Sequence, residues 1–149
     1  MPGLARFVLI AAAFAGGFAL AATAGLAGGI APGLWRITSR TETGGVIGPP
    51  HETSRCFSTG EANDVVATFV PPATAENSNC APVEHNLHGG KLAWRLACRG
   101  QTDMEQSGEF IFDSPRHYTA TLRTRAAVSG ATMVDSQDIL EGQWVSECR

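Results

Sequence analysis

The chain lacks the short motifs that mark common catalytic and cofactor sites. It contains no Gly-x-Ser-x-Gly nucleophile elbow, no phosphate-binding glycine loop and no His-Glu-x-x-His helix. It also has no Cys-x-x-Cys pair, the spacing expected of a redox or zinc site. Nothing in the pattern therefore motivates an enzyme or a bound cofactor, although catalytic groups can assemble from distant positions.

A run of basic residues is absent as well. The 149 residues include 11 basic and 14 acidic side chains, for a formal net charge of −3. A mildly acidic chain without a basic patch is a poor match for the phosphate backbone, so we expect no nucleic-acid partner.

Charge is missing altogether between Phe7 and Ala31. One positive charge, at Arg6, precedes this apolar stretch, and small residues follow it, as in a secretory signal. We predict a signal peptide over residues 1–24, with cleavage after Ala21 as the second choice. The alternative is a retained anchor, because the uncharged stretch is long enough to span a bilayer.

The remaining residues, 25–149, are predicted to form a single disulfide-stapled domain. Removal of the signal takes away one arginine and no acid, which leaves 10 basic and 14 acidic residues and a net charge of −4. A chain of about 125 residues buries roughly two thirds of its unfolded surface, enough for one core. No later segment is apolar enough to cross a membrane.

Period-two alternation predicts a mainly β fold. Turn signals every eight to twelve residues suggest an antiparallel barrel or sandwich of about seven strands. One short helix is predicted over 59–68, because Ser58 and Glu61 form a capping box and apolar residues follow at helical spacing. The clearest strands are predicted over 34–43, 52–57, 83–87, 92–96, 105–112, 117–128 and 132–140.

Two hairpins can be aligned residue by residue. A two-residue turn at Gly89-Gly90 pairs position 87 with 92 and 85 with 94, but turns Cys80 away from Cys98. One extra residue near Ala81-Pro82 restores that pair, and a three-residue loop over 88–90 is the second choice. In the next hairpin, a loop over 114–116 places Phe112 opposite Tyr118.

The chain has four cysteines, all after the predicted signal. In an oxidising compartment, an even set without metal spacing is typical of disulfides. The hairpin alignment selects Cys80 with Cys98, which leaves Cys56 with Cys148.

The histidines and carboxylates give weak signals. His85 and His88 would share a helix face, but on a strand they point to opposite faces, which disfavours a metal site. Glu105 and Glu109 share a strand face about 13 Å apart, too far for a paired acid and base.

Aromatic side chains fall on the predicted inner faces of several strands. They either pack as a core or line a partly hollow interior that holds a small apolar ligand. Gly108, which shares that face, removes a side chain and favours the cavity. The candidate ligand-binding residues are Trp35, Trp94, Phe110, Phe112, Tyr118 and Leu122.

The opposite face of the 117–128 strand is polar. Arg123 and Arg125 lie side by side on it, next to Thr119 and Thr121, and could contact an anionic envelope component. A plain solvated face is the alternative, because the acidic domain repels anions at long range.

The chain resembles domain-of-unknown-function family 3617, a group of small exported bacterial proteins. The resemblance is carried by Pro32-Gly33-Leu34-Trp35, by Trp94 followed by Cys98, and by the order of the four cysteines. It implies a Gram-negative source and a periplasmic or secreted location, and it supplies no activity. We therefore expect an exported envelope protein that acts as a non-catalytic binding or interaction module; the alternative is an enzyme with an unrecognised active site.

Overall fold

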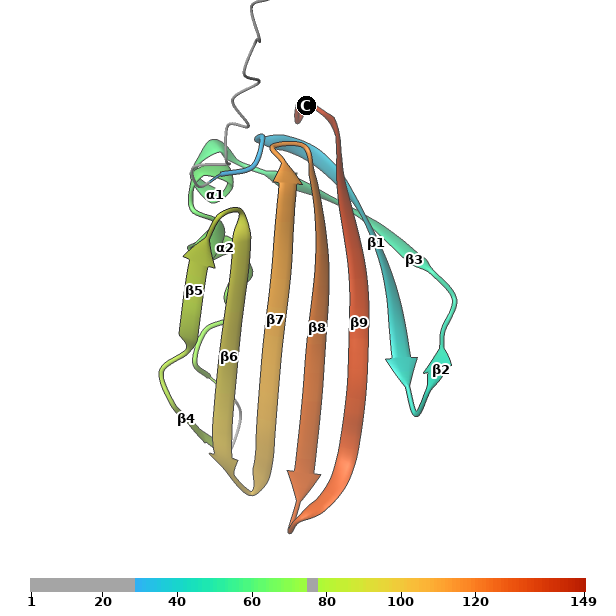
Figure 1. Cartoon of the computed structure of the whole chain (residues 1–149), viewed down its shortest axis with the longest axis vertical. Helices are drawn as coiled ribbons and strands as arrows, with labels where there is room; N and C mark the ends of the chain where they lie inside the picture. The colour runs from blue at the N-terminus through green and yellow to red at the C-terminus, as the bar shows by residue number, and fades with distance from the viewer. Residues whose placement is uncertain (1–28, 75–77) are drawn as a thin grey trace, which may run out of the picture.

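The computed structural model describes residues 29–74 and 78–149, which form one curved antiparallel sheet with two short helices against one face (Figure 1). The strands are β1 (Gly33–Thr43), β2 (Val46–Ile47), β3 (His51–Phe57), β4 (Ser78–Cys80), β5 (Glu84–His88), β6 (Lys91–Gly100), β7 (Thr102–Ser114), β8 (His117–Val128) and β9 (Ala131–Ser146). The helices are α1 (Thr59–Asn63) and α2 (Val65–Phe69). The predicted signal peptide, residues 1–24, lies outside the described residues. Within them, no helix is long and apolar enough to cross a membrane.

The sheet is open, with the strand order β3, β1, β9, β8, β7 and β6. β2 pairs with the end of β1, and β4 and β5 share the far side of β6. Because the two edges do not meet, the architecture is sandwich-like rather than a barrel. The mainly β, antiparallel class is confirmed, but the described residues contain nine strands and two helices instead of about seven and one.

The additional elements have local causes. The edge strand opposite β6 is interrupted between Cys80 and Glu84, where Pro82 lacks the N–H that a regular ladder requires. The predicted helix is divided at Asp64, whose backbone leaves the helical region at φ −121° and ψ 78°. The Asp64 carboxylate then accepts a hydrogen bond of 2.9 Å from the backbone N–H of Ala67 and caps α2.

The start of α1 has the predicted capping box. The Ser58 hydroxyl accepts a hydrogen bond from the Glu61 backbone N–H, and the Glu61 carboxylate accepts one of 2.9 Å from the Ser58 backbone N–H. Arg55 of β3 also donates to Glu61, at 2.9 Å. These bonds, chiefly the one from the Ser58 backbone, lower the pKa of Glu61 to about 2.

The hairpin that ends in β6 has the predicted register. Leu87 pairs with Leu92, and one extra residue on the edge strand after Cys80 brings this cysteine opposite Cys98. Their Cα atoms lie 3.9 Å apart and a disulfide joins them. The predicted bulge near Pro82 is therefore confirmed.

The β7–β8 hairpin also has the predicted pairing, with a different turn. Phe112 lies opposite Tyr118 as expected. The predicted three-residue loop is wrong, because Ser114 pairs with His117 across a two-residue turn and a register shift at Asp113 absorbs the remaining residue.

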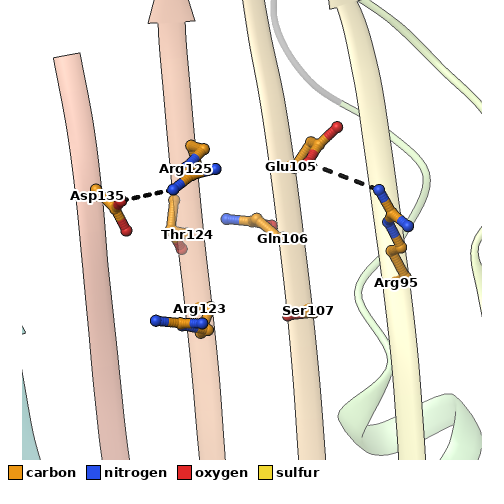
Figure 2. A pocket seen from close by; sticks show the side chains of 8 residues that line it. All are labelled: Arg95, Glu105, Gln106, Ser107, Arg123, Thr124, Arg125 and Asp135. Carbon is orange, nitrogen blue, oxygen red and sulfur yellow. Dashed lines mark hydrogen bonds and ion pairs between the residues drawn. The ribbon is translucent and has the colours of Figure 1, made fainter. Parts of the chain in front are cut away.

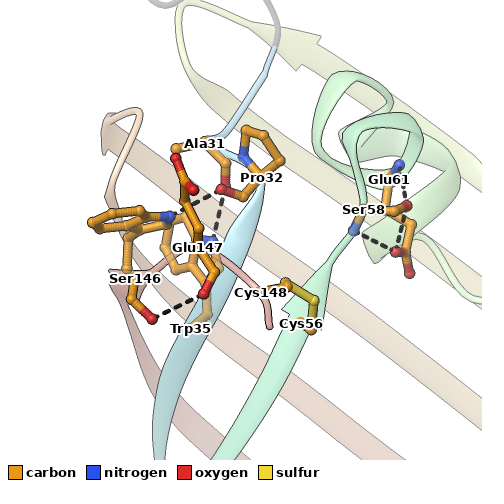
Figure 3. Close-up of a disulfide and its surroundings, with 10 residues drawn as sticks. Ala31, Pro32, Trp35, Cys56, Ser58, Glu61, Ser146, Glu147 and Cys148 are labelled. Atoms are coloured by element: carbon orange, nitrogen blue, oxygen red, sulfur yellow. Dashed lines mark hydrogen bonds between the residues drawn. A yellow bond between two sulfur atoms is a disulfide. The ribbon is translucent and has the colours of Figure 1, made fainter.

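The second disulfide joins β3 to the C-terminal segment. Cys56 and Cys148 have Cα atoms 6.0 Å apart, and Figure 3 shows the bond beside the start of β1. Nearby, the Trp35 indole donates a hydrogen bond of 2.9 Å to the Ala31 carbonyl. The Trp144 indole donates one of 3.0 Å to the carbonyl of Pro32. These contacts fasten both ends of the described chain at the same end of the sheet.

One face of the sheet, called here the inner face, carries the core. Side chains of a strand alternate between faces, so β6 buries Leu92, Trp94 and Leu96 while Lys91 and Arg95 remain exposed on the outer face. The two helices add Ala62, Val65 and Phe69 to the same core.

Candidate functional site

An aromatic cluster closes the inner face at the helical end of the sheet. The ring of Phe69, from α2, lies 4.8 Å from that of Phe110, 5.6 Å from that of Phe112 and 5.4 Å from that of Tyr118. Tyr118 in turn lies 5.5 Å from Trp35. Burial raises the pKa of Tyr118 to about 12, so its phenol stays protonated. This end is a packed core, because Phe69 occupies the space between the strands.

A groove of about 520 Å³ opens beside this cluster, between the inner face and the end of α2. Its apolar part is made by Phe69, Trp94, Phe110 and Leu122. The chain that leaves α2, residues 70–72, forms one wall. The groove therefore begins where the packed core ends.

The far part of the groove is polar. Gln106, Thr124 and Asp138 line it, from three neighbouring strands. The Thr41 hydroxyl of β1 donates a hydrogen bond to the Asp138 carboxylate. The groove as a whole thus has one apolar end and one end with hydrogen-bonding groups.

The indole of Trp94 fills the space that a side chain at position 108 would take. Trp94 pairs with Gly108 across β6 and β7, and a Cβ atom there would overlap the indole ring. The prediction that Gly108 leaves a cavity is therefore wrong, because the indole of Trp94 packs on this glycine. Among the described residues, nothing accepts a hydrogen bond from the buried indole N–H of Trp94.

Gly142 repeats this arrangement on β9. It pairs with Tyr118, and a Cβ atom at Gly142 would overlap the phenol ring. Two aromatic rings thus pack directly on glycines of the neighbouring strand, where no side chain separates the ring from the backbone.

The outer face carries a shallow groove of about 310 Å³ that is rich in arginine (Figure 2). Arg125 donates a hydrogen bond of 2.9 Å to Asp135, and Arg95 lies 3.7 Å from Glu105. Arg123, two residues before Arg125 on β8, is exposed and forms no ion pair with any residue of the described ranges. The predicted solvated face is therefore present, but only Arg123 of the two predicted arginines is free to meet an anion.

A histidine between two carboxylates lies at the other end of the outer face. His117 contacts Asp113 at 2.8 Å and Glu141 at 3.2 Å through its two ring nitrogens. The hydrogen bond to Asp113 is the main cause of a raised His117 pKa. His85 and His88, considered from the sequence as a metal site, lie on β5 and on opposite faces of it. In residues 29–74 and 78–149, no three His, Cys, Asp or Glu side chains gather closely enough to hold a metal ion.

The structure divides the six predicted ligand-binding residues into two sets. Trp94, Phe110 and Leu122 line the inner groove. All six except Leu122 are buried core residues, and Trp35, Phe112 and Tyr118 do not line the groove.

Residues that sequence reasoning did not assign to the site come from α2 and the chain after it. Helical spacing placed Phe69 on the apolar side of the predicted helix, and this spacing is the sequence signal that could have indicated its contact with the sheet. Spacing does not say which part of the sheet the helix covers, so the groove wall made by residues 67–72 could not be found that way.

Comparison with known proteins identifies the family of the chain. Neither a curated protein nor a solved structure matches the chain. One family profile, described as a protein of unknown function (DUF3617), matches residues 30–148 and so includes every strand, both helices and all four cysteines. The chain belongs to this DUF3617 family.

Proposed function

We propose that this protein is a non-catalytic binding module of the cell envelope that holds a small apolar ligand, such as an acyl or isoprenoid chain. The observation that carries the proposal is the inner groove, which is lined by the partly buried Leu122 and by the largely buried rings of Trp94 and Phe110 at the margin of the core. Ligand pockets of about 300–1,000 Å³ are typically lined in this way, with a few polar groups that orient the ligand. The groove of about 520 Å³ falls within that range.

The polar end of the groove supports a ligand with one hydrogen-bonding end. Gln106 and Thr124 offer both donors and acceptors, and Asp138 offers a carboxylate. An amphiphile would lay its apolar part over Leu122 and its polar part against these groups. A wholly apolar molecule would leave them without partners and would bind less well.

The proposed location is the periplasm or the extracellular space. Two disulfides staple the domain, at Cys56–Cys148 and Cys80–Cys98, and such bonds persist in oxidising compartments. Mass spectrometry of the exported protein tests the accompanying signal peptide: the mature chain should begin at Gly25. A chain that retains Met1 would contradict cleavage.

The ligand proposal is tested by fluorescence titration with fatty acids and isoprenoid alcohols in solution. The chain has three tryptophans, of which Trp94 lines the groove. We expect a saturable change in emission that disappears in Trp94→Phe while the other two tryptophans still report a folded protein. Native mass spectrometry of protein purified from the periplasm should show a copurified small molecule. If no apolar compound changes the emission and none copurifies, the proposal is wrong.

A matched pair of variants locates the site. Leu122→Phe enlarges a side chain that faces the groove, and we expect it to weaken ligand binding at least tenfold. Ile111→Phe makes a comparable change on the outer face, where Ile111 is exposed, and should leave binding unaltered. Equal effects of the two variants would place the ligand elsewhere.

An anionic envelope component is a second proposed partner, and the unpaired Arg123 supports it. Arg123 shares its grooves with Glu42 and Asp135 but forms no ion pair with any described residue, so its guanidinium can donate to a phosphate or carboxylate. Thr119 and Thr121 lie on the same exposed face of β8. Arg123→Ser should abolish any salt-sensitive binding to vesicles that contain phosphatidylglycerol, whereas Arg40→Ser, on the same face of β1, is the control. No binding by the parent protein would end this proposal.

A further inference from the structure

Exposed apolar side chains gather on the β1–β2 and β8–β9 hairpins. The turns of both hairpins lie at the end of the sheet away from the helices (Figure 1). Of the nine large apolar side chains that are exposed in the described residues, five lie on two hairpin ends. The β1–β2 turn carries Val46 and Ile47, which are 72% and 58% exposed. The β8–β9 hairpin carries Val128, Met133 and Val134, which are 42%, 68% and 42% exposed.

The β8–β9 hairpin projects furthest (Figure 1). Thr43, the last residue of β1, pairs with Ser136, so residues 131–135 of β9 continue past the β1–β2 turn. At about 3.3 Å per residue, the hairpin extends roughly 15 Å beyond that turn. Its tip is a tight turn at Ser129 and Gly130, with φ of 52° and 80°.

A register shift directs one of these side chains outward. Val134 pairs with Ala126 and Thr132 pairs with Ala127, so Met133 is an extra residue without a partner on β8. Bulges of this kind change the direction of a side chain. Here the bulge presents an apolar methionine to the surroundings rather than to the core, although the rest of the sheet buries its large apolar residues on the inner face.

The tip carries no charge. The stretch from Ala126 to Val134 is free of acidic and basic residues, and the charged residues that flank it, Arg125 and Asp135, neutralise one another at 2.9 Å. The tip itself is thus uncharged and apolar, and the charge beside it is Asp103 of β7, which pairs with Ala127. A second copy of the chain is a poor occupant for the tip, because five side chains are far fewer than the 20–30 residues per side of a stable interface.

We propose that the β8–β9 tip, assisted by the β1–β2 turn, inserts into the surface of a lipid bilayer, from which the groove takes its ligand. The inner face offers a short path between the two sites. Met104, Ala126 and Val134 form an apolar row just behind the tip, and the next row, with Gln106 and Thr124, already lines the groove. This inference rests on the proposed function, because the bilayer is named as the source of the groove's ligand. Since Arg125 and Asp135 pair with one another, docking depends mainly on apolar contact.

The experiment is cosedimentation of the mature protein with vesicles of phosphatidylcholine alone and of phosphatidylcholine with phosphatidylglycerol. We expect binding to phosphatidylcholine alone that salt affects little; any additional, salt-sensitive binding to the mixture is assigned to Arg123 and not to the tip. Met133→Ser/Val134→Ser should weaken binding at least tenfold, because two apolar side chains lose their burial, and Val46→Ser/Ile47→Ser, whose turn lies roughly 15 Å behind the tip, should weaken it less. The matched control is Ile111→Ser/Ile139→Ser, which alters two residues of 46% and 43% exposure in the middle of the outer face.

The outcomes separate this inference from the proposed function. Ligand titration of the Met133→Ser/Val134→Ser variant without vesicles should match the parent protein, since the groove is intact and the fold is checked in the same spectra. Absence of vesicle binding, or equal binding by tip and control variants, would overturn docking even where ligand binding in solution is normal. Light scattering that shows a dimer broken by the tip variants would assign the tip to a second copy and overturn the inference as well.

Discussion

Packing of Trp94 on Gly108 predicts a strong and measurable coupling between the two residues. A Cβ atom at position 108 overlaps the indole, so Gly108→Ala forces Trp94 from its place in the inner face. Overpacking of this kind costs about 1–3 kcal/mol of unfolding free energy. The same substitution at a strand position with room for a methyl group would instead gain roughly 0.5–1 kcal/mol, because alanine loses less backbone freedom than glycine on folding.

A double-mutant cycle distinguishes these effects. Trp94→Leu removes the indole and opens space above Gly108, so Gly108→Ala in that background should be neutral or slightly stabilising. The two predicted changes differ by about 1 kcal/mol or more, a coupling energy of the size seen for residues in direct contact. Urea denaturation of the parent, the two single variants and the double variant measures it.

Two controls sharpen the cycle. Ser107→Ala, one residue away on the outer face, should combine additively with Trp94→Leu because Ser107 belongs to the opposite side of β7. Gly142→Ala with Tyr118→Leu should repeat the coupling on β9. If the effects of Gly108→Ala and Trp94→Leu simply add, Trp94 does not pack on Gly108 and the description of the groove floor is refuted.

Three other outcomes are expected. Cys148→Ser opens a loop of 92 residues and should lower the free energy of unfolding by about 4.6 kcal/mol, while free Cys56 forms linked dimers on non-reducing gels; an unchanged urea midpoint would contradict the bond. The pKa of His117 is raised by Asp113, so its stabilisation is complete below about pH 6.5 and lost as pH rises through the folded-state value. His117→Gln should remove the decrease in urea midpoint that the parent protein shows as pH rises above about 6.5. The pKa of Glu61 falls from 4.5 to about 2, so its contribution is present above about pH 4.5 and lost toward about pH 2. An acid titration in which Glu61→Gln unfolds with the same profile as the parent would disprove the cap's role.

Contacts between neighbouring strands could be predicted from the sequence. The pairings of Leu87 with Leu92 and of Phe112 with Tyr118 follow from alternation and turn length, both of which act over a few residues. The Cys80–Cys98 bond followed from the same register. Turn details were less accurate, because a bulge at Asp113 moves the loop without changing the side of the sheet on which Phe112 lies.

The candidate site was only partly accessible from the sequence. Period-two patterns correctly assigned Trp94, Phe110 and Leu122 to one face, but they gave the same signal for Trp35 in the core. What separates the two sets is the position of Phe69, which fills one end of the inner face and leaves the other open.

The amino-acid sequence by itself determined the β class, the hairpin registers and the cysteine pairs, because each depends on side-chain alternation and on turns of a few residues. Tertiary structure alone decided that the sheet stays open, that α2 covers only one end of it, and that the β8–β9 tip projects beyond β1. β1 pairs with β9 from nearly 100 positions away, as in Thr41 with Asp138. Such pairings arise from the total burial of apolar surface in the folded chain, which no local pattern records.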